Sequence, residues 1–535
     1  MNLPVNSTLA SLRLWLGFWL VACIIQVANG SHILGVFVNL HRSQLLVHLA
    51  VARTLLQRGH QLTLVTTLPL EEDWLAAVAN TTQVKHVLVP WQLPTSHELQ
   101  QQQRQHNDNF ITRLQWTLTR LELSGELLQQ PAWLAFMQHV PTPRYDLLLL
   151  GYHFNEHLLG VAAHFDCPVA IISTQQPIGF IHSLMGNAEE RWYVPQPYDS
   201  QQRTGFPALL FGLWEKSSEY LARRVMQRIY SVHFASPRYP SFEEMRRRVV
   251  LALNNHHMIS EGPIGPVLPS MLDIGGIVME QLSHVDAAFD KGLTQQKQQQ
   301  QQLQKRQRQQ QRQRQRRPFI LFSLGTRFSW RLASKHLEQS FAAAFVQLPE
   351  YDIYWTHDGN DASGINLTHA HIKLAKWWPQ SQLLSQPEAE LFITHGGKGS
   401  LTEALFHGVP LLGLPLVGDQ RANLRKMQNK GWGLTLDVQS VDQVQLLSAI
   451  RRMLGDAKFK QKIKKDALLY RDRPLNASYL AAYWLEYVIR HKGAKHLYSP
   501  ARELDFWQYY LLDIRLVLYL LVALLTWLLW LIIRM

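Results

Sequence analysis

The sequence predicts an α/β protein with two Rossmann-like domains, each built on a parallel sheet, followed by one C-terminal transmembrane helix. Three observations support this prediction. The chain has 535 residues, too many for a single hydrophobic core. In both halves, apolar runs of strand length alternate with helical patterns, and this alternation builds parallel sheets. Near the end, residues 516–533 form an uncharged run long enough to cross a membrane.

The first 30 residues are predicted to be a signal peptide. Arg13 precedes an apolar run at 14–27, and Ala28 and Gly30 are small residues that fit a signal-peptidase site. The run is short for a span, and a strand-like segment follows it at once. We therefore expect Ser31 to begin the mature chain, with an N-terminal membrane anchor as the less favoured alternative.

The first α/β domain is expected at 31–277. Its opening strand, helix and second strand form a β-α-β unit, from which parallel sheets are built. Two later apolar runs have no polar alternation and are typical of strands covered on both faces. The expected elements are a strand at 33–38, a helical pattern at 45–56 that stops at Gly59, and strands at 61–66, 145–150 and 169–173.

A linker is expected at 278–317, and it explains most of the charge. The net charge is +13, and the stretch 291–317 holds nine Lys and Arg residues with no acidic residue. This stretch is also rich in Gln, so it cannot bury a core and is interpreted as a solvated, disordered insert. Nucleic-acid binding is the alternative for such a basic run. A lumenal location argues against it, so no nucleic-acid partner is expected.

The second α/β domain is expected at 318–512. The same pattern of apolar strands and helices restarts after the insert, so two domains face each other across a cleft. Ligands of open parallel sheets bind beyond the carboxyl ends of the strands. The expected elements are strands at 319–323, 352–356 and 391–394, a helix at about 400–407 that ends at Gly408, and a strand at 411–414.

The C-terminal segment 513–535 is predicted to span the membrane. Arg515 and Arg534 flank the uncharged run, whose length corresponds to about 27 Å of helix, close to the thickness of the endoplasmic reticulum membrane. A buried core helix is the alternative. Together with the signal peptide, the span predicts a single-pass type I protein of the endoplasmic reticulum membrane with lumenal domains. The helix has no association motif, so a homo-oligomer is left open.

Cysteines and glycosylation sequons are compatible with this location. Cys23 would leave with the signal peptide, so Cys167 remains alone and no intrachain disulfide can form. Sequons begin at Asn80, Asn366 and Asn476. Such triplets also occur by chance, and they permit the lumenal assignment without proving it.

The segment 392–403 carries the strongest signal for a ligand. A strand ends in His395, and Gly396, Gly397 and Gly399 precede a helix expected to begin at about Ser400. Free amides and the positive end of the helix dipole would suit a diphosphate. The alternatives are a plain glycine-rich turn and a capping box between Ser400 and Glu403. The motifs of dinucleotide oxidoreductases and P-loop NTPases are absent.

With its flanking blocks, this segment resembles the UDP-glycosyltransferases (UDP-glucuronosyl and UDP-glucosyltransferases), most closely their insect branch. The flanking blocks are Trp-Trp-Pro-Gln at 377–380 and Pro-Leu-Val-Gly-Asp-Gln-x-x-Asn at 415–423. The resemblance covers nearly the whole mature chain apart from the insert. It implies the GT-B fold of that family. Further matching segments lie at 58–60, 182–187, 273–276, 322–326, 471–474, 484–487 and 490–493.

The resemblance implies a site for a UDP-sugar donor. Trp377 would stack on uracil, Gln380 would contact the base or ribose, and Glu403 would accept hydrogen bonds from the ribose hydroxyls. No metal ion and no cofactor besides the UDP-sugar co-substrate are implied. The remaining donor residues are His395, Gly397, Gly399, Ser400 and Thr326 for the diphosphate, and Asp419 and Gln420 for the sugar hydroxyls.

The resemblance also implies an inverting displacement in which a histidine, oriented by an acidic residue, accepts the proton of the acceptor hydroxyl. Counting without gaps from Arg58 places the base position at Gln44. Counting from Asp146 places the acid position at Gly151. Both positions are altered, and an amide cannot serve as a general base.

Three interpretations of these alterations stay open. His41 and His153 lie close by in sequence and would form a displaced pair. Alternatively, the chain transfers sugar slowly to acidic acceptors, or binds UDP-sugar without turnover as a pseudoenzyme, in which case Gln44→His with Gly151→Asp would raise transfer. The favoured function is transfer of a hexose, glucose, to a small lipophilic acceptor recognised by variable loops such as 95–109. A structural glycoprotein with a degenerate site is disfavoured because the donor residues are intact.

Overall fold

The computed structural model describes residues 30–38, 41–70, 74, 83–91, 110–139, 142–199, 201–262, 264–281, 317–325, 328, 330, 333–358, 369–504, 506–509 and 511–534. Several predicted features lie outside the described residues. They are the signal peptide up to residue 29, the sequons at Asn80 and Asn366, the loop at 95–109, the insert up to residue 316, and Thr326.

The first half contains a seven-stranded sheet with the order β3-β2-β1-β4-β5-β6-β7, and every neighbouring pair of strands is parallel. The central strands are buried on both faces, as their unbroken apolar runs predicted. The strands are β1 (His32–Phe37), β2 (Gln61–Thr66), β3 (Val84–Leu88), β4 (Leu147–Tyr152), β5 (Val169–Ser173), β6 (Val249–Asn254) and β7 (Met271–Asp273).

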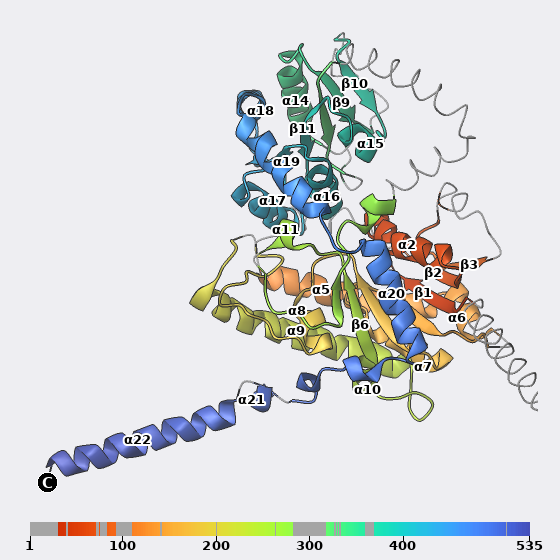
Figure 1. Ribbon diagram of the computed structural model, residues 1–535, viewed down its shortest axis with the longest axis vertical. Helices are drawn as coiled ribbons and strands as arrows, with labels where there is room; N and C mark the ends of the chain where they lie inside the picture. Colours follow the sequence, from red (N-terminus) through yellow and green to blue (C-terminus); the bar gives the residue numbers. More distant parts are fainter. Residues whose placement is uncertain are drawn as a thin grey trace, which may run out of the picture.

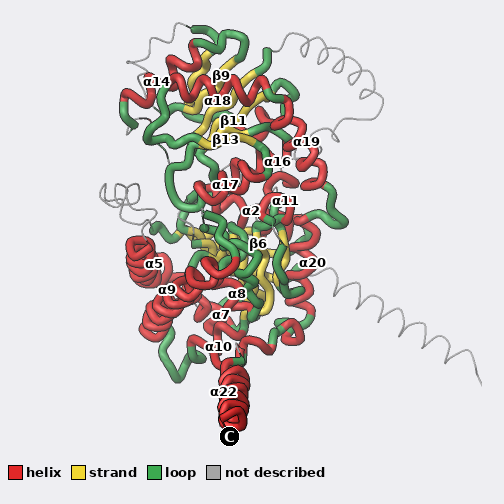
Figure 2. The backbone as a smooth tube through the Cα atoms, turned by 90° about the vertical axis from the view of Figure 1, so that its left-hand side faces the viewer, coloured by secondary structure: helices red, strands yellow, loops and turns green. Residues whose placement is uncertain are grey.

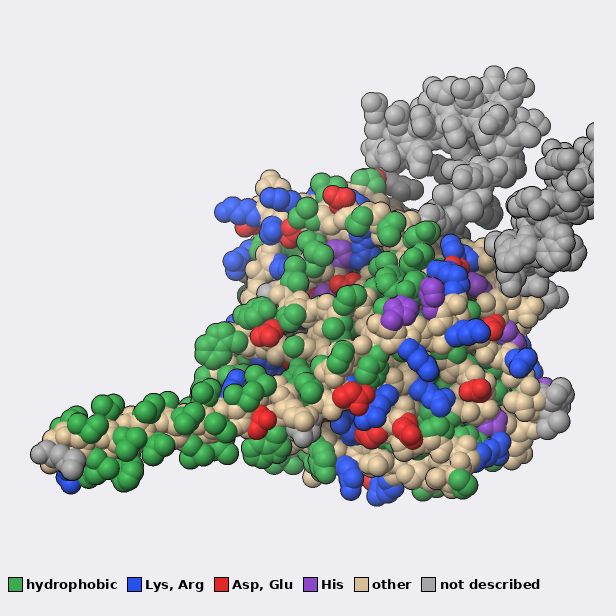
Figure 3. Space-filling view, turned by 60° about the horizontal axis from the view of Figure 1, so that its bottom comes forward, with side chains coloured by type: hydrophobic (Ala, Val, Ile, Leu, Met, Phe, Trp, Pro, Cys, Tyr) green, Lys and Arg blue, Asp and Glu red, His purple; other side chains and the backbone are tan. Residues whose placement is uncertain are grey.

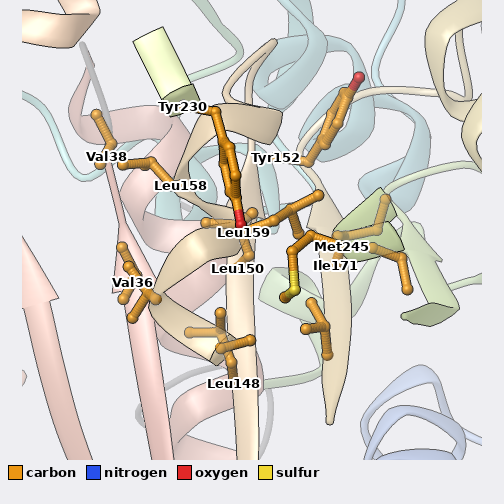
Figure 4. Packing of buried hydrophobic residues seen from close by; sticks show 14 of the residues in the cluster. Val36, Val38, Leu148, Leu150, Tyr152, Leu158, Leu159, Ile171, Tyr230 and Met245 are labelled. Atoms are coloured by element: carbon orange, nitrogen blue, oxygen red, sulfur yellow. The ribbon is translucent and has the colours of Figure 1, made fainter. Parts of the chain in front are cut away.

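Helices cover both faces of this sheet. Alternate residues of a strand point to opposite faces, so Val36, Leu148 and Leu150 pack with Tyr230 and Met245 on one side (Figure 4). The other face packs against α2. The helices are α2 (Arg42–Gln57), α5 (Phe110–Ser124), α6 (Pro131–Met137), α7 (Gly160–Phe165), α8 (Gly179–Met185), α9 (Gly205–His233), α10 (Phe242–Arg247) and α11 (Met258–Glu261), with short 3-10 turns at Gly125–Gln129 and Glu156–Leu159.

The second half contains a six-stranded parallel sheet with the order β10-β9-β8-β11-β12-β13. It lies above the first sheet in Figure 1, and separate apolar clusters cover its two faces. Its elements are β8 (Phe319–Ser323), α14 (Lys335–Val346), β9 (Asp352–Thr356), β10 (Ile372–Ala375), α15 (Gln380–Leu384), β11 (Ala389–Thr394), α16 (Lys398–His407), β12 (Leu411–Gly413), α17 (Gln420–Asn429), β13 (Gly433–Thr435), α18 (Gln443–Gly455) and α19 (Ala457–Arg471).

The chain then returns to the first half through α20 (Ala477–Arg490). The small residues Ala477 and Ala481 are fully buried in the apolar cluster that α2 shares with the first sheet. Glu486 accepts a hydrogen bond of 2.8 Å from Arg58 and contacts His60 at 3.1 Å. Figure 1 shows α20 lying along the lower sheet. The boundaries 31–277 and 318–512 stay predictions, and α20 packs on the first half although it falls within the second range.

The last helix, α22 (Leu512–Arg534), extends away from both sheets (Figures 1 and 2). Within the described part of the chain it is the one helix with the length and composition of a membrane span, and none of its residues is buried. Two short 3-10 turns, Lys495–Leu497 and Pro500–Arg502, and α21 (Phe506–Tyr509) connect it to α20. A core helix would bury its apolar residues, so the core-helix alternative does not hold.

Candidate donor and acceptor site

The turn after β11 presents backbone amides at the carboxyl edge of the second sheet. α16 begins at Lys398 with Gly397 as its N-cap, and no side chain caps this end. Gly396 has a φ of +81°, in the left-handed region that glycine adopts without strain. The unsatisfied amides of the first turn and the positive end of the helix dipole therefore face the space beyond the strands, which suits a diphosphate.

The start of α16 corrects the expectation that the helix begins at Ser400. It begins two residues earlier, so Ser400 lies inside the first turn and cannot be the N-cap of a capping box with Glu403. Both side chains instead face Gln380, whose Nε2 lies 3.4 Å from Ser400 Oγ and donates to Glu403 Oε2 at 2.9 Å. The capping explanation for these two residues is therefore wrong.

The imidazole of His395 lies between two glycines from different loops. A Cβ atom on Gly397 would lie 2.4 Å from Nε2 of His395, and a Cβ atom on Gly325 would lie 2.5 Å from Cε1. Gly325 also has a φ of +76°. No larger residue fits at either position without moving the ring. The two glycines therefore set the position of His395 at the mouth of the turn.

We expect Gly397→Ala to weaken UDP-glucose binding about tenfold, or about 1.4 kcal/mol, because the added methyl group displaces the ring of His395. Gly455→Ala at the end of α18 is the control, since Gly455 is not among the predicted donor residues and a Cβ atom there meets no protein atom within 4 Å. Calorimetric titration of both variants measures the difference. An equal loss in the two variants would contradict the explanation through His395.

Trp377, Gln380 and Glu403 form the wall on which the nucleoside was predicted to lie. Trp377 is 59% exposed, as a stacking platform must be. The guanidinium of Arg42, the first residue of α2, lies 5.5 Å from the centroid of its ring and so brings the first half of the chain to this wall. Burial raises the pKa of Glu403 to about 7, against the hydrogen bond from Gln380, which lowers it.

UDP-glucose binding is expected to strengthen as the pH rises from 6 to 8. The ionised form of Glu403 is the better acceptor for ribose hydroxyls, and with a pKa of about 7 its population rises from about a tenth to about nine-tenths over this range. The affinity should therefore rise up to about tenfold, with proton release on binding below pH 7. Titrations in buffers of different ionisation enthalpy measure that proton.

Glu403→Gln provides the control for this pH dependence. The variant should bind UDP-glucose weakly and equally at every pH from 6 to 8, because its amide does not titrate. UDP-glucose is preferred over UDP because its diphosphate diester does not titrate in this range. A wild-type affinity that is constant from pH 6 to 8 would contradict the role of Glu403.

Asp419 is the N-cap of α17 and Gln420 its first residue, after the loop that follows β12, and Asn423 of the same helix joins this segment to the turn after β11. Gln420 Oε1 accepts hydrogen bonds from the amides of Leu416 and Val417 at 2.7 and 2.9 Å. Asn423 Nδ2 donates to Asp419 Oδ2 at 2.7 Å and to the carbonyl of Gly396 at 3.2 Å. The positioning roles of Gln420 and Asn423 did not follow from the sequence.

A cavity of about 320 Å³, open to solvent, lies between the two halves of the chain. Asp419 of the second half lines it together with His41 and Gln44 at the start of α2. The structure therefore brings the predicted sugar-binding residue and both candidate base positions to one space. The remaining walls contain an apolar group, Leu114, Phe154, Ile178 and Phe180, and a polar group that includes Arg120, His153, Arg191, Glu215 and Glu219.

His153 lines the same cavity, but its geometry does not favour a role as the orienting residue of a displaced pair. Its Nε2 lies 2.7 Å from a guanidinium nitrogen of Arg120. A guanidinium can only donate hydrogen bonds, so Nε2 must accept, and this arrangement requires a neutral imidazole with its proton on Nδ1. The orienting residue implied by the family resemblance is acidic and carries a negative charge. A neutral His153 cannot supply that charge.

The altered acid position, Gly151, is filled by a neighbouring histidine. Gly151 is buried in β4, and a Cβ atom on it would lie 2.7 Å from Cε1 of His48. His48 lies on α2 one turn after Gln44 and stacks on Phe37 with ring centroids 4.7 Å apart. Burial lowers its pKa to about 4, so it is neutral. The sequence carried one signal for this arrangement: His48 lies four residues after the base position, within an apolar helix face, where a buried histidine is expected.

A buried ion cluster joins the turn after β11 to the first half of the chain. Glu261 of α11 forms an ion pair with Lys398, the first residue of α16. Lys426 of α17 contacts Glu261 at 3.3 Å and Gln176 at 3.0 Å. All three charged side chains are nearly inaccessible to solvent, so removing one would leave an uncompensated buried charge. In the described residues, no group of three or more His, Cys, Asp or Glu is arranged to hold a metal ion.

Comparison with known proteins yields one family match and several relatives. The family model described as "UDP-glucoronosyl and UDP-glucosyl transferase" matches residues 283–534. UDP-glycosyltransferase UGT5 of Dactylopius coccus is 27% identical over 380 residues, which cover 70% of this chain and 68% of that protein. UDP-glucosyltransferase 2 of the same species is 25% identical over 509 residues, covering 92% and 91%. Human UDP-glucuronosyltransferase 2B28 is 37% identical over 197 residues, 36% of either protein.

Two solved structures have the same fold. A UDP-glucosyltransferase from Polygonum tinctorium, described as capable of glucosylating indoxyl, superposes with a TM-score of 0.54 at 15% identity, over 86% of this chain and 99% of that chain. The glycotransferase of kitacinnamycin gives a TM-score of 0.52 at 16% identity over the same shares. At such identities the likeness shows the fold alone. It confirms the predicted pair of Rossmann-like domains in the GT-B arrangement.

Proposed function

Because the chain belongs to the UDP-glucuronosyl and UDP-glucosyltransferase family, we propose that it transfers glucose from UDP-glucose to a hydroxyl group of a small lipophilic acceptor. Membership makes the chain a UDP-glycosyltransferase, as its motifs predicted. Glucose is the proposed sugar because a relative named as a glucosyltransferase matches over 91% of its length, whereas the human glucuronosyltransferase matches over 36%. The apolar part of the cavity wall supports a lipophilic acceptor.

The observation that carries the proposal is the uncapped turn after β11, with His395 positioned between Gly325 and Gly397. This turn would bind the diphosphate through backbone amides and His395. Trp377, Gln380 and Glu403 lie beside it and would hold uracil and ribose. Asp419, which faces the cavity, would orient the sugar together with Gln420.

The proposed reaction is a single displacement with inversion at the anomeric carbon. The acceptor oxygen forms a bond to that carbon while the bond from the carbon to the diphosphate breaks, and UDP leaves with the electron pair. The acceptor proton must pass to a base. His41 and His153 both place an imidazole in the cavity wall. Because Nε2 of His153 already accepts a hydrogen bond from Arg120, we propose His41 for this role.

Binding of UDP-sugar without turnover is the second candidate, and a specific observation favours it. Gln44 stands at the base position, and His48 fills the volume beside Gly151 where an orienting acid would stand. A donor site that is retained beside an altered acceptor side would suit a UDP-sugar-binding partner protein. A transfer to acceptors that are already acidic would need little help from a base and is the intermediate case.

The full chain in phospholipid nanodiscs, titrated with UDP and UDP-glucose by calorimetry, tests the donor site. Transfer is then assayed with 4-nitrophenol, which is acidic, and with 2-phenylethanol, which is not. Binding with transfer to both acceptors supports the enzyme with a working base. Binding without transfer selects the second candidate, and the absence of UDP binding rejects both.

We also propose that α22 anchors the chain in the endoplasmic reticulum membrane with both halves in the lumen. The helix has 23 residues, or about 35 Å of rise, enough to cross the hydrocarbon layer. Asn476 is exposed at the start of α20, so its predicted sequon is accessible to a glycosylating enzyme. A mobility shift that disappears on glycosidase treatment and in Asn476→Gln would support the lumenal location.

A further inference from the structure

An apolar stripe runs along the solvent side of α9, the long helix at the outer face of the first half. The stripe is defined by positions three or four residues apart, which share one face of a helix. Phe206 and Leu213 are each 64% exposed. An outward helix face is ordinarily polar, whereas the first four turns here carry large apolar side chains. The members of the stripe are Phe206, Leu209, Leu210, Leu213, Tyr220 and Leu221.

The stripe is extended by two aromatic residues and ends in two cations. Trp192 and Tyr193, on the loop before α9, are 61% and 49% exposed. Further along the same helix face, Arg224 and Arg228 are exposed, and Arg228 pairs with Glu122 at 2.6 Å. No exposed acidic residue interrupts the apolar part of the stripe. Exposed aromatic and aliphatic side chains bordered by arginine are typical of a helix at a membrane interface.

The position of the stripe relative to α22 is limited by a short tether. Ser499 Oγ donates to the carbonyl of Gly186 at 3.2 Å, and Arg502 donates to the carbonyl of Val249 at 2.8 Å, so the chain is fixed to the first half up to residue 502. α22 begins at Leu512. Ten residues reach at most about 35 Å even when fully extended. A bilayer that contains α22 must therefore pass close to this end of the molecule.

The stripe lies at that same end. In Figures 1 and 2, α9 and α22 both lie in the lower part of the molecule, away from the second sheet. Figure 3 shows hydrophobic side chains along α22 and on the part of the body next to it. The attachment at Gly186 is also close in sequence to Trp192 and Tyr193. The short tether therefore keeps the bilayer that contains α22 close enough to contact the apolar stripe of α9.

We propose that the α9 stripe, with Trp192 and Tyr193, lies in the interfacial layer of the membrane that α22 crosses. The body then rests on the bilayer instead of turning freely on its tether. The long axis of α9 would lie parallel to the membrane plane, with its apolar face in the headgroup and upper acyl region and Arg224 at the headgroups. Because the cavity is lined by Glu215, Ser218 and Glu219 of α9, the acceptor opening would also lie near the membrane.

A second copy of the chain is the competing occupant of the stripe, and the tether favours the bilayer. The membrane is held next to α9 in every molecule by α22, whereas a second copy must be recruited by diffusion. A protein partner would also have to cover a row of side chains that ends in two arginines. The two occupants predict different surroundings for Leu213 and are separable by experiment.

The test places a nitroxide label on Leu213→Cys or Phe206→Cys in the full chain, with Cys23→Ser, reconstituted in phosphatidylcholine vesicles. Cys167 is buried, and burial raises the pKa of its thiol to about 12, so it stays unlabelled. Leu468→Cys on α19 is the matched control, because Leu468 is also 64% exposed but belongs to the second half. Collision of the label with oxygen, which concentrates in lipid, is compared with collision with a water-soluble nickel chelate.

Labels at 213 and 206 should collide frequently with oxygen and rarely with the nickel chelate, and the label at 468 should show the reverse. Leu209→Glu with Leu210→Glu should shift the label at 213 towards water and leave UDP-glucose affinity unchanged. Equal access of nickel to 213 and 468 would overturn the proposal. Dipolar broadening between labels at 213, which indicates a second copy, would overturn it as well. None of these outcomes depends on whether the chain transfers sugar.

Discussion

His41→Ala is expected to lower glucose transfer to 2-phenylethanol by about 10²- to 10⁴-fold, the usual contribution of a general base. His41 lies at the start of α2 and lines the cavity that Asp419 reaches from the second half. The loss should be smaller with 4-nitrophenol, whose hydroxyl is already acidic and needs less help. Initial rates over a pH series with both acceptors measure this difference.

Two controls separate loss of a base from loss of structure. UDP-glucose affinity of His41→Ala should equal that of the wild type, because the donor residues lie on the second half. Gln44→Asn alters the same cavity without touching a titrating group, so its effect on the rate should be much smaller. Equal losses with the two acceptors, or an unchanged pH profile in His41→Ala, would show that His41 is not the base.

Gln44→His with Gly151→Asp is expected to restore little activity unless His48 is also made small. A Cβ atom at position 151 already lies 2.7 Å from the His48 ring, so an aspartate there would clash in the interior of the first half. The triple variant with His48→Ala removes the clash and rebuilds the dyad implied by the family resemblance. If the chain binds UDP-glucose without turnover, the triple variant should transfer to 2-phenylethanol about 10²-fold or more faster than the wild type. If His41 already acts as the base, the triple variant should gain little.

Comparing the double and triple variants shows whether the clash between position 151 and His48 limits the transfer rate of the double variant. Gly151→Asp alone should lower the midpoint of thermal unfolding, because overpacking of a filled interior costs about 1–3 kcal/mol and the buried carboxyl group adds to that cost. His48→Ala alone should stay folded and gain no transfer. A double variant that folds and works as well as the triple variant would contradict the steric explanation.

Most of the fold followed from local sequence patterns. The predicted strands at 61–66, 169–173, 319–323 and 352–356 coincide with β2, β5, β8 and β9. Continuous apolar runs are informative in a parallel sheet because both faces of its strands are covered. The return of α20 to the first half was not foreseen, since an amphipathic pattern shows that a helix has a buried face but not which sheet covers it.

Around the predicted donor site, the sequence correctly placed a glycine-rich turn and a histidine after a strand, but the predicted start of α16 was wrong. The two-residue error arose because Ser400 is a good N-cap by type, whereas the uncapped turn at Gly397 reflects the packing of Gly396 against Leu424. The role of Gln380 as a donor to Glu403, and the pKa of about 7 that burial gives Glu403, depend on neighbours distant in sequence.

The sequence alone determined the two parallel sheets and the apolar terminal helix, because each depends on the periodicity of residues close together in the chain. The tertiary structure alone decided that His48 occupies the space beside Gly151, that Arg120 holds His153 in a neutral form, and that α9 exposes an apolar stripe near α22. These features depend on distances between residues far apart in the chain, and such distances exist only once the packing of the whole molecule is complete.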